Sequence, residues 1–184
     1  MKILVVDDHF EIREKVKALL SLHNDIEIVG QAENGQSAIE LCRTLKPDVV
    51  LLDISMPMMN GIEAMGIMIA EKSCGRVVIL SSHRHKRFID AAINGGAMGY
   101  VLKSCVFDDL YNALKAAAAD KLFISPKTGI AISEYKKAAE FAPDKADIYY
   151  NIGVIYSQFN NSKEAKEFFE KYLKLNPGGK NAET

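Results

Sequence analysis

The chain has 184 residues, which is enough for one ordinary domain and a small second module. Apolar residues make up 48% of the sequence and charged residues 26%, a balance typical of globular proteins. The formal net charge of −1 gives no overall reason to expect nucleic-acid binding, and the sequence lacks the stretch of roughly 20 apolar residues that a membrane-spanning helix needs.

Short apolar runs alternate with helix-period segments through the first 120 residues. The runs are rich in Val, Ile and Leu, and they predict strands buried on both faces at residues 3–6, 26–29, 49–52, 77–80 and 99–102. The segments between and after them predict helices at residues 10–22, 35–45, 61–72, 86–95 and 106–119, with Asn34 as an N-cap. Five repeats of strand and helix predict an α/β fold, a five-stranded parallel sheet with helices on both faces. Right-handed crossovers favour the flavodoxin-like strand order 2-1-3-4-5.

The pattern changes after about residue 120. Residues 121–129 contain Pro126 and Gly129 and are expected to form a linker. Helical segments follow at residues 130–141, 146–158 and 162–175, separated by Pro143 and by a polar stretch at residues 160–162. We therefore expect an α/β domain over residues 1–120, a helical module over residues 130–177 and a flexible tail over residues 178–184.

Polar residues follow the predicted strands at one edge of the sheet. Asp7 and Asp8 follow the first strand, Asp53 the third, Ser81 the fourth and Lys103 the fifth. Three carboxylates close together repel one another, and a hard cation with oxygen ligands, such as Mg²⁺, would neutralise them. A carboxylate can also act as a nucleophile and carry a phosphoryl group, with an ammonium and a hydroxyl balancing the charge.

Four motifs in this order resemble the response-regulator receiver domain of two-component systems: VVDD, LLDISMPMMNG, ILSS and GYVLKS. The resemblance covers residues 1–120. The local sequence is similar in style to receivers that usually precede a helix-turn-helix output domain. It implies a phosphoryl group supplied by a histidine kinase, a phosphotransfer protein or a small phosphodonor, and no enzymatic activity beyond the domain's own phosphorylation and dephosphorylation. The implied roles are phosphoacceptor for Asp53, Mg²⁺ ligands for Asp7, Asp8, Asp53 and the backbone carbonyl of Ser55, phosphoryl partner for Lys103, switch hydroxyl for Ser81 and switch aromatic for Tyr100.

Other interpretations exist for these residues. Taken singly, Asp7 and Asp8 could be acids at a helix start, Lys103 a surface lysine and Tyr100 a packing residue. Haloacid-dehalogenase-like phosphatases also use an aspartate at a strand end, but their nucleophile belongs to a DxD pattern on the first strand, which this sequence lacks. A nearby HxH at residues 83–85 is expected to lie in a solvated loop rather than to bind a metal.

The C-terminal segment repeats itself at a period of 34 residues, which is the tetratricopeptide period. The residues that recur are Ala131, Tyr135, Ala138 and Pro143, which match Ala165, Phe169, Tyr172 and Pro177. The stretch that begins at Tyr149 resembles the tetratricopeptide signature, and the match covers one and a half repeats. Tyr172 stands where the signature has a small residue, and a generic helical hairpin is the alternative.

From residue 125 onward there are nine Lys, eight Asp or Glu and no Arg, which argues against nucleic-acid binding by this module. We therefore expect a response regulator that signals through protein–protein contacts with an unknown target, or as a homodimer. The alternatives are a DNA-binding regulator that acts with a partner chain and a structural oligomerisation protein. The three cysteines are widely spaced and odd in number, which suits the reducing cytoplasm.

Overall fold

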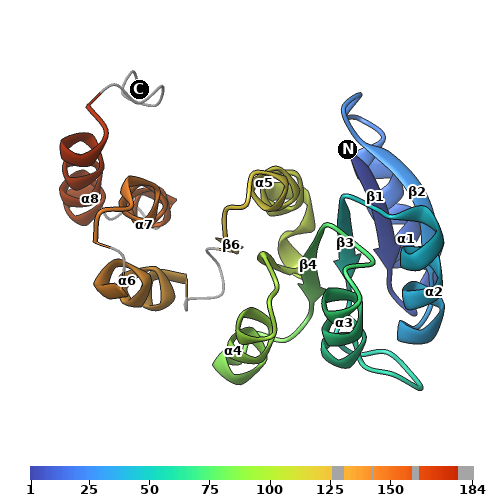
Figure 1. Ribbon diagram of the computed structural model, residues 1–184. Coiled ribbons are helices and arrows are strands. Elements are labelled where there is room, and N and C mark those ends of the chain that lie inside the picture. Colours follow the sequence, from blue (N-terminus) through green and yellow to red (C-terminus); the bar gives the residue numbers. More distant parts are fainter. Residues whose placement is uncertain (126–130, 142, 159–161, 178–184) are drawn as a thin grey trace. The chain divides into compact units, whose positions relative to one another are not determined.

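The computed structural model describes residues 1–125, 131–141, 143–158 and 162–177. The chain divides into two compact units, Met1–Ser125 and Pro126–Thr184, and each is described by itself. The first unit holds the sheet, and the second holds the C-terminal helices (Figure 1).

The first unit contains a parallel sheet with the strand order β2-β1-β3-β4-β5-β6. Every neighbouring pair is parallel, which requires a crossover between consecutive strands. The strands are β1 (Lys2–Val6), β2 (Glu27–Ala32), β3 (Val49–Leu52), β4 (Arg76–Ser81), β5 (Gly99–Leu102) and β6 (Phe123–Ile124). The order of the first five is the flavodoxin-like order that the sequence predicts.

The sixth strand is a correction to the expected five. Phe123–Ile124 falls within the expected linker, yet it pairs with β5 through Gly99 and Tyr100, and Ile124 is buried. Two residues are too few to produce a recognisable strand period, which is why the sequence pattern does not reveal this strand. Residues 126–129 of the expected linker lie outside the described residues.

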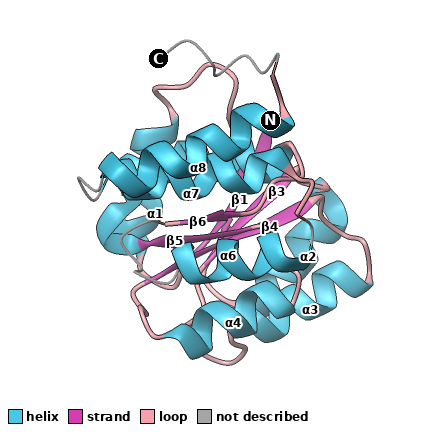
Figure 2. Cartoon of the chain, turned by 90° about the vertical axis from the view of Figure 1, so that its left-hand side faces the viewer, coloured by secondary structure: helices cyan, strands magenta, loops and turns pink. Residues whose placement is uncertain are grey.

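Helices cover both faces of the sheet. They are α1 (Phe10–Leu20), α2 (Gly35–Leu45), α3 (Gly61–Ala70), α4 (Lys86–Asn94) and α5 (Val106–Ala118). Alternate strand residues pack with α1 and α5 in one continuous core, and α2, α3 and α4 cover the opposite face. Figure 2 shows α3 and α4 together on one side of the strands. The side chains of Asn34 and Asn60 accept hydrogen bonds at the starts of α2 and α3, so the expected Asn34 cap is confirmed.

The second unit consists of α6 (Ala131–Phe141), α7 (Ala146–Gln158) and α8 (Ser162–Leu175). Gly153 of α7 lies directly against Phe169 of α8, because a Cβ on Gly153 would come within 2.7 Å of the Phe169 ring. Tyr172 occupies the position where the signature has a small residue, and it is buried with its ring 5.2 Å from that of Tyr150. An aromatic pair therefore fills the space at this point.

No helix among the described residues combines the length and the apolar character that crossing a bilayer would require. The expected tail at residues 178–184 and the polar residues 160–161 lie outside the described residues.

Candidate functional site

Four of the side chains expected to form the site lie where strands of the first unit end. Asp7 follows β1, Asp53 follows β3, Ser81 is the last residue of β4 and Lys103 follows β5. The backbone extends the sheet order into the site, because the Asp53 amide donates to the Val6 carbonyl at 2.9 Å. The parallel strands thus bring residues far apart in sequence to one edge.

Lys103 lies between two buried carboxylates. Its Nζ is 2.6 Å from Asp7 Oδ2 and 2.8 Å from Asp53 Oδ2. The side chain of Lys103 is 14% exposed and that of Asp7 is 1% exposed, so these ion pairs are largely shielded from water. Burial alone would lower the pKa of Lys103, but the hydrogen bonds and charges of Asp53 and Asp7 outweigh it and raise this pKa. Lys103 is therefore held in its charged form.

The Asp53 carboxyl group is in the opposite situation. Burial raises the pKa of Asp53 above its ordinary value, and the nearby Asp7 charge raises it further, although the Lys103 ammonium partly offsets both effects. Its Oδ1 accepts a hydrogen bond from the Ile54 amide at 2.7 Å. One ammonium beside two buried carboxylates leaves excess negative charge, which favours binding of an additional cation.

The loop after Asp53 requires a glycine at its end. A Cβ at Gly61 would lie 1.9 Å from the Asp53 carbonyl oxygen, which is an impossible distance. The Gly61 amide donates to the Ile54 carbonyl at 2.9 Å, so α3 begins directly against the phosphoacceptor candidate. Between them, Met58 adopts a positive φ of 67° in a tight turn closed by a bond from the Met59 amide to the Pro57 carbonyl.

Asp7 and Asp8, together with His9, form a group whose ligand atoms are close enough to hold one metal ion. His9 Nδ1 lies 3.2 Å from Asp7 Oδ1 and 2.8 Å from Asp8 Oδ1. Asp8 Oδ1 is buried, and the contact with the His9 ring is the close polar contact that the structure gives it. A buried carboxylate oxygen with so few donors around it, beside a second carboxylate, fits a hard cation such as Mg²⁺. The sequence interpretation did not include His9, although it adjoins the acid pair.

The two expected switch residues both hydrogen-bond the backbone of His83. Ser81 is fully buried, and its hydroxyl accepts a hydrogen bond from the His83 amide at 3.2 Å. Burial raises the pKa of Tyr100, and its phenol donates to the His83 carbonyl at 2.9 Å. Tyr100 is therefore turned into the protein, beneath the loop that follows β4.

His83 lies in the loop after β4, where it was expected, but it is only partly exposed and its side chain makes specific contacts. Its ring stacks on Phe88 of α4 with the centroids 4.0 Å apart, and its Nε2 lies 2.8 Å from the Ser55 hydroxyl. Its amide also donates to the Ser81 hydroxyl at 3.2 Å. His83 thereby connects the loop after β3 to the switch residues. A histidine in a short polar segment gives no period signal, so the sequence did not predict these contacts.

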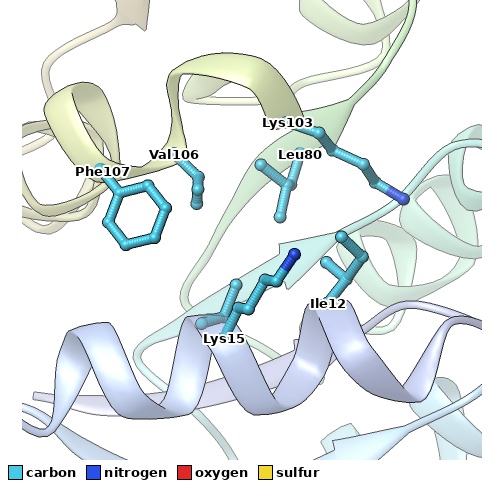
Figure 3. Close-up of a pocket in the computed structure, with 7 residues that line it drawn as sticks. Ile12, Lys15, Leu80, Lys103, Val106 and Phe107 are labelled. Atoms are coloured by element: carbon cyan, nitrogen blue, oxygen red, sulfur yellow. The ribbon is translucent and has the colours of Figure 1, made fainter.

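A cleft of about 90 Å³ lies beside the site, between α1 and α5 (Figure 3). Its lining is largely apolar, with two lysines, and consists of Ile12, Lys15, Val16, Leu80, Lys103, Val106 and Phe107. Phe107 is 71% exposed, so the outer wall of the cleft is an exposed ring.

The family assignment follows from a comparison with known families. The family model of the response regulator receiver domain matches residues 3–115, which is more than half of the chain. The chain therefore belongs to the response-regulator receiver family. Models of the tetratricopeptide repeat and the TPR repeat match residues 146–178 and 127–158, so the receiver is fused to a TPR-like helical segment.

Curated relatives resemble the receiver part. The nitrate/nitrite response regulator protein NarL of Escherichia coli K12 is 42% identical over 123 residues, which are 67% of this chain and 57% of that protein. The transcriptional regulatory protein DegU of Brevibacillus brevis is 37% identical over 138 residues, which are 74% of this chain and 58% of that protein. The chain thus spans less than two thirds of the length of these relatives.

Solved structures agree with the fold. A two-component response regulator of the LuxR family from Aurantimonas sp. SI85-9A1 is 32% identical and superimposes with a TM-score of 0.67. The superposition covers 73% of this chain and 96% of that one. The flavodoxin-like receiver fold predicted from the sequence is confirmed, with one more strand than expected.

Proposed function

We propose that this protein is a response regulator that accepts a phosphoryl group on Asp53 and signals through protein–protein contacts. The observation that carries the proposal is the Lys103 ammonium between the carboxylates of Asp7 and Asp53, at the carboxyl edge of the parallel sheet. This arrangement supplies a nucleophile, a cation beside it and a second acid beside which a metal can bind.

In the proposed reaction a carboxylate oxygen of Asp53 attacks the phosphorus of a phosphohistidine or of a small acyl phosphate. The new O–P bond forms as the bond to the leaving nitrogen or oxygen breaks, and the leaving atom keeps the electron pair. Lys103 then pairs with an oxygen of the bound phosphoryl group. Transfer ends on the protein itself, so we propose no substrate turnover beyond phosphorylation and hydrolysis at Asp53.

The proposed metal ligands are Asp7, Asp8, Asp53 and the backbone carbonyl of Ser55. Mg²⁺ bound there would offset the negative charge of the phosphoryl oxygens. The raised pKa of Asp53 supports this assignment, because a second cation would favour the ionised carboxylate that must act as the nucleophile.

The donor is proposed to be a histidine kinase or a phosphotransfer protein. Such a protein must bring its phosphohistidine to the strand edge and contact the surface around it. The cleft between α1 and α5 is suited to this contact, because it reaches Lys103 and exposes Phe107 beside it. An exposed aromatic ring at the rim of a functional site is typical of a protein-binding surface.

Ser81 and Tyr100 are proposed to form the switch. The phosphoryl group offers new acceptor oxygens, and the Ser81 hydroxyl can turn away from the His83 amide to donate to one of them. Because Tyr100 is already turned inward here, phosphorylation would stabilise this conformation over one with an exposed ring. Crystals with and without a phosphoryl analogue test this; an unchanged Ser81 and an inward Tyr100 in both would contradict it.

The helical module is proposed to pass the signal to a protein target, or to pair two copies of the chain. One and a half repeats bury few side chains, and repeat modules bury their apolar faces on neighbours. Leu173 and Leu175 of α8 are exposed. A cooperative, soluble monomer from residues 126–184 alone would remove this argument for a partner.

A DNA-binding role with a partner chain is the second candidate, because DegU is named a transcriptional regulatory protein. A gel-shift assay with the phosphorylated full chain separates the two candidates: retardation of DNA by this chain alone would favour the second. A cytoplasmic location is proposed from the three free cysteines.

The direct test is incubation with acetyl phosphate and Mg²⁺, followed by intact mass and peptide mapping. We expect one phosphoryl group on Asp53 and a fall to background in Asp53→Asn. Asp48→Asn is the matched control. Asp48 lies directly before β3, at the end opposite to Asp53, and its carboxylate accepts a hydrogen bond from the Lys2 amide. Wild-type phosphorylation of Asp53→Asn would overturn the proposal, and an equal loss in Asp48→Asn would show that the effect is not specific to the site.

A further inference from the structure

Two of the three cysteines meet far from the acidic site. Cys42 lies buried in α2, and Cys74 lies half-buried in the loop between α3 and β4. Cys42 Sγ lies 3.5 Å from Met68 Sδ, and Ser73, the neighbour of Cys74, donates its amide to the Met68 carbonyl at 3.0 Å. Each thiol is also the strongest influence on the pKa of the other. Cys42 and Cys74, which have all of β3 and α3 between them in the sequence, thus lie in one cluster with Met68.

The backbone holds this cluster together. Lys46, at the end of α2, donates its amide to the Cys42 carbonyl at 3.0 Å, and Gly75 donates its amide to the Pro47 carbonyl at 2.9 Å. These bonds tie the end of α2 to the residue that follows Cys74. Cys74 lies two residues before β4 and Cys42 in the helix before β3, whereas Asp53 follows the carboxyl end of β3.

The two thiols have different surroundings. The interaction with Cys42 lowers the pKa of Cys74; burial opposes this effect, while the positive charges of Arg76 and Lys46 add to it. The pKa of Cys42 is raised, first by its interaction with Cys74 and then by burial. The Cys74 thiol is partly exposed and lies near two cations, so it is the more nucleophilic of the pair. The Cys42 thiol beside it is buried and neutral.

We propose that Cys42 and Cys74 form an oxidation site for small hydroperoxides, with Cys74 as the attacking thiol and Cys42 as the resolving thiol. The Cys74 thiolate attacks a peroxide oxygen, the O–O bond breaks, and hydroxide leaves to give a sulfenic acid. Cys42 Sγ then attacks the Cys74 sulfur, the S–O bond breaks, and the hydroxyl leaves as water with the proton of Cys42. With hydrogen peroxide the two thiols are oxidised to a disulfide and the peroxide is reduced to water.

The disulfide would close a covalent loop that contains β3, the Asp53 loop and α3. Such a cross-link restricts the unfolded chain and stabilises the folded receiver. The consequence is a receiver whose stability rises under oxidising conditions. This inference does not rest on the proposed function, because Asp53 takes no part in it.

The test treats the reduced full chain with hydrogen peroxide and measures intact mass, mapped peptides and thermal unfolding. We expect a loss of about 2 Da for the two thiol hydrogens, a Cys42–Cys74 peptide within one chain, and a midpoint several degrees higher that dithiothreitol reverses. Cys105→Ser is the matched control and should behave like the wild type. Cys74→Ser should remove the reaction, and Cys42→Ser should leave a Cys74 sulfenic acid that dimedone traps.

Several results obtained with the wild-type chain alone would overturn the proposal. The test therefore remains decisive even if a cysteine variant fails to fold. These are a bridge that uses Cys105, a bridge between two chains, or sulfinic acid on Cys74 with no bridge formed. Unreacted Cys42 and Cys74 at a peroxide dose that oxidises a free cysteine peptide would also overturn it.

Discussion

The two units of this chain bury different kinds of side chain. The receiver buries charged groups, with Asp7 and Asp53 nearly inaccessible beside Lys103. The described buried residues of the helical module are aromatic or aliphatic, such as Tyr135, Ile152 and Tyr172. A sheet covered on both faces has a large apolar core that can offset a few buried charges, whereas a small helical module depends on each aromatic contact. Substitutions in the two units should therefore fail for different reasons.

The largest effect is expected when the positive charge of Lys103 is removed from the receiver site. Lys103→Ala leaves the buried carboxylates of Asp7 and Asp53 facing each other without a counter-charge. We expect a loss of about 3 kcal/mol in the free energy of unfolding, the usual cost of breaking a buried ion pair. Mg²⁺ should restore part of this stability, because it would supply positive charge at the same place. Urea unfolding with and without Mg²⁺ measures both effects.

Lys115→Ala is the control for this variant. Lys115 pairs with Asp25 on the surface, where solvent screens the interaction. Its removal should leave the unfolding curve unchanged within error, with or without Mg²⁺. If Lys103→Ala were as stable as this control, the charged cluster would contribute nothing to the fold, and the contrast between the two units would fail.

The sequence predicted most of this cluster but not its neighbours. The apolar runs located β3 and β5 at their observed bounds, and a parallel sheet necessarily collects the residues that follow its strands. The contacts of His83 with Ser55 and Phe88 were not predicted, because they depend on the path of a loop. The meeting of Cys42 and Cys74 depends on packing between segments distant in sequence, which a single sequence does not reveal.

The second effect tests the close approach of α7 and α8 in the helical module. In Gly153→Ala the new methyl group would come within 2.7 Å of the Phe169 ring. Overpacking typically costs 1–3 kcal/mol, which outweighs the gain of up to about 1 kcal/mol from replacing a helical glycine. We expect a net loss of about 1 kcal/mol in this unit and faster amide hydrogen exchange in α7 and α8.

A second substitution separates crowding from other causes. Phe169→Leu removes the ring that the new methyl group would strike. The double variant should therefore be less destabilised than the sum of the two single variants. Strict additivity would mean that Gly153 and Phe169 do not limit each other.

The third effect concerns Asp53, whose buried carboxylate is expected to lower the free energy of unfolding of the receiver at neutral pH. Its pKa in the folded protein is raised above the ordinary 3.8, chiefly by burial. A raised folded pKa favours the protonated form, so its stabilising contribution is present at low pH and is lost as the pH rises through the folded pKa. At neutral pH, Asp53→Asn should therefore be more stable than the wild type, by about 1 kcal/mol.

Unfolding curves at a series of pH values measure this third effect. The advantage of Asp53→Asn should shrink as the pH falls through the raised folded pKa toward the ordinary 3.8, because the folded wild-type carboxyl group takes up its proton above that value. Asp48→Asn at the opposite end of β3 should show no such advantage. An Asp53→Asn variant that is less stable than the wild type at neutral pH would mean that the attraction to Lys103 exceeds the cost of burial.

The smallest effect should be a gain in stability, on substitution of a receiver glycine where an added methyl group would meet no other atom. A Cβ at Gly66, in the middle of α3, would have no heavy atom within 4 Å, whereas at Gly153 it would meet a ring. Gly66→Ala should therefore stabilise the receiver by about 0.5–1 kcal/mol, because alanine loses less backbone entropy in a helix. The same substitution then has opposite signs in the two units, and unfolding curves of the two variants measure this directly. A loss at Gly66 would show that the exposed face of α3 contacts a second molecule in solution, which a concentration series would reveal.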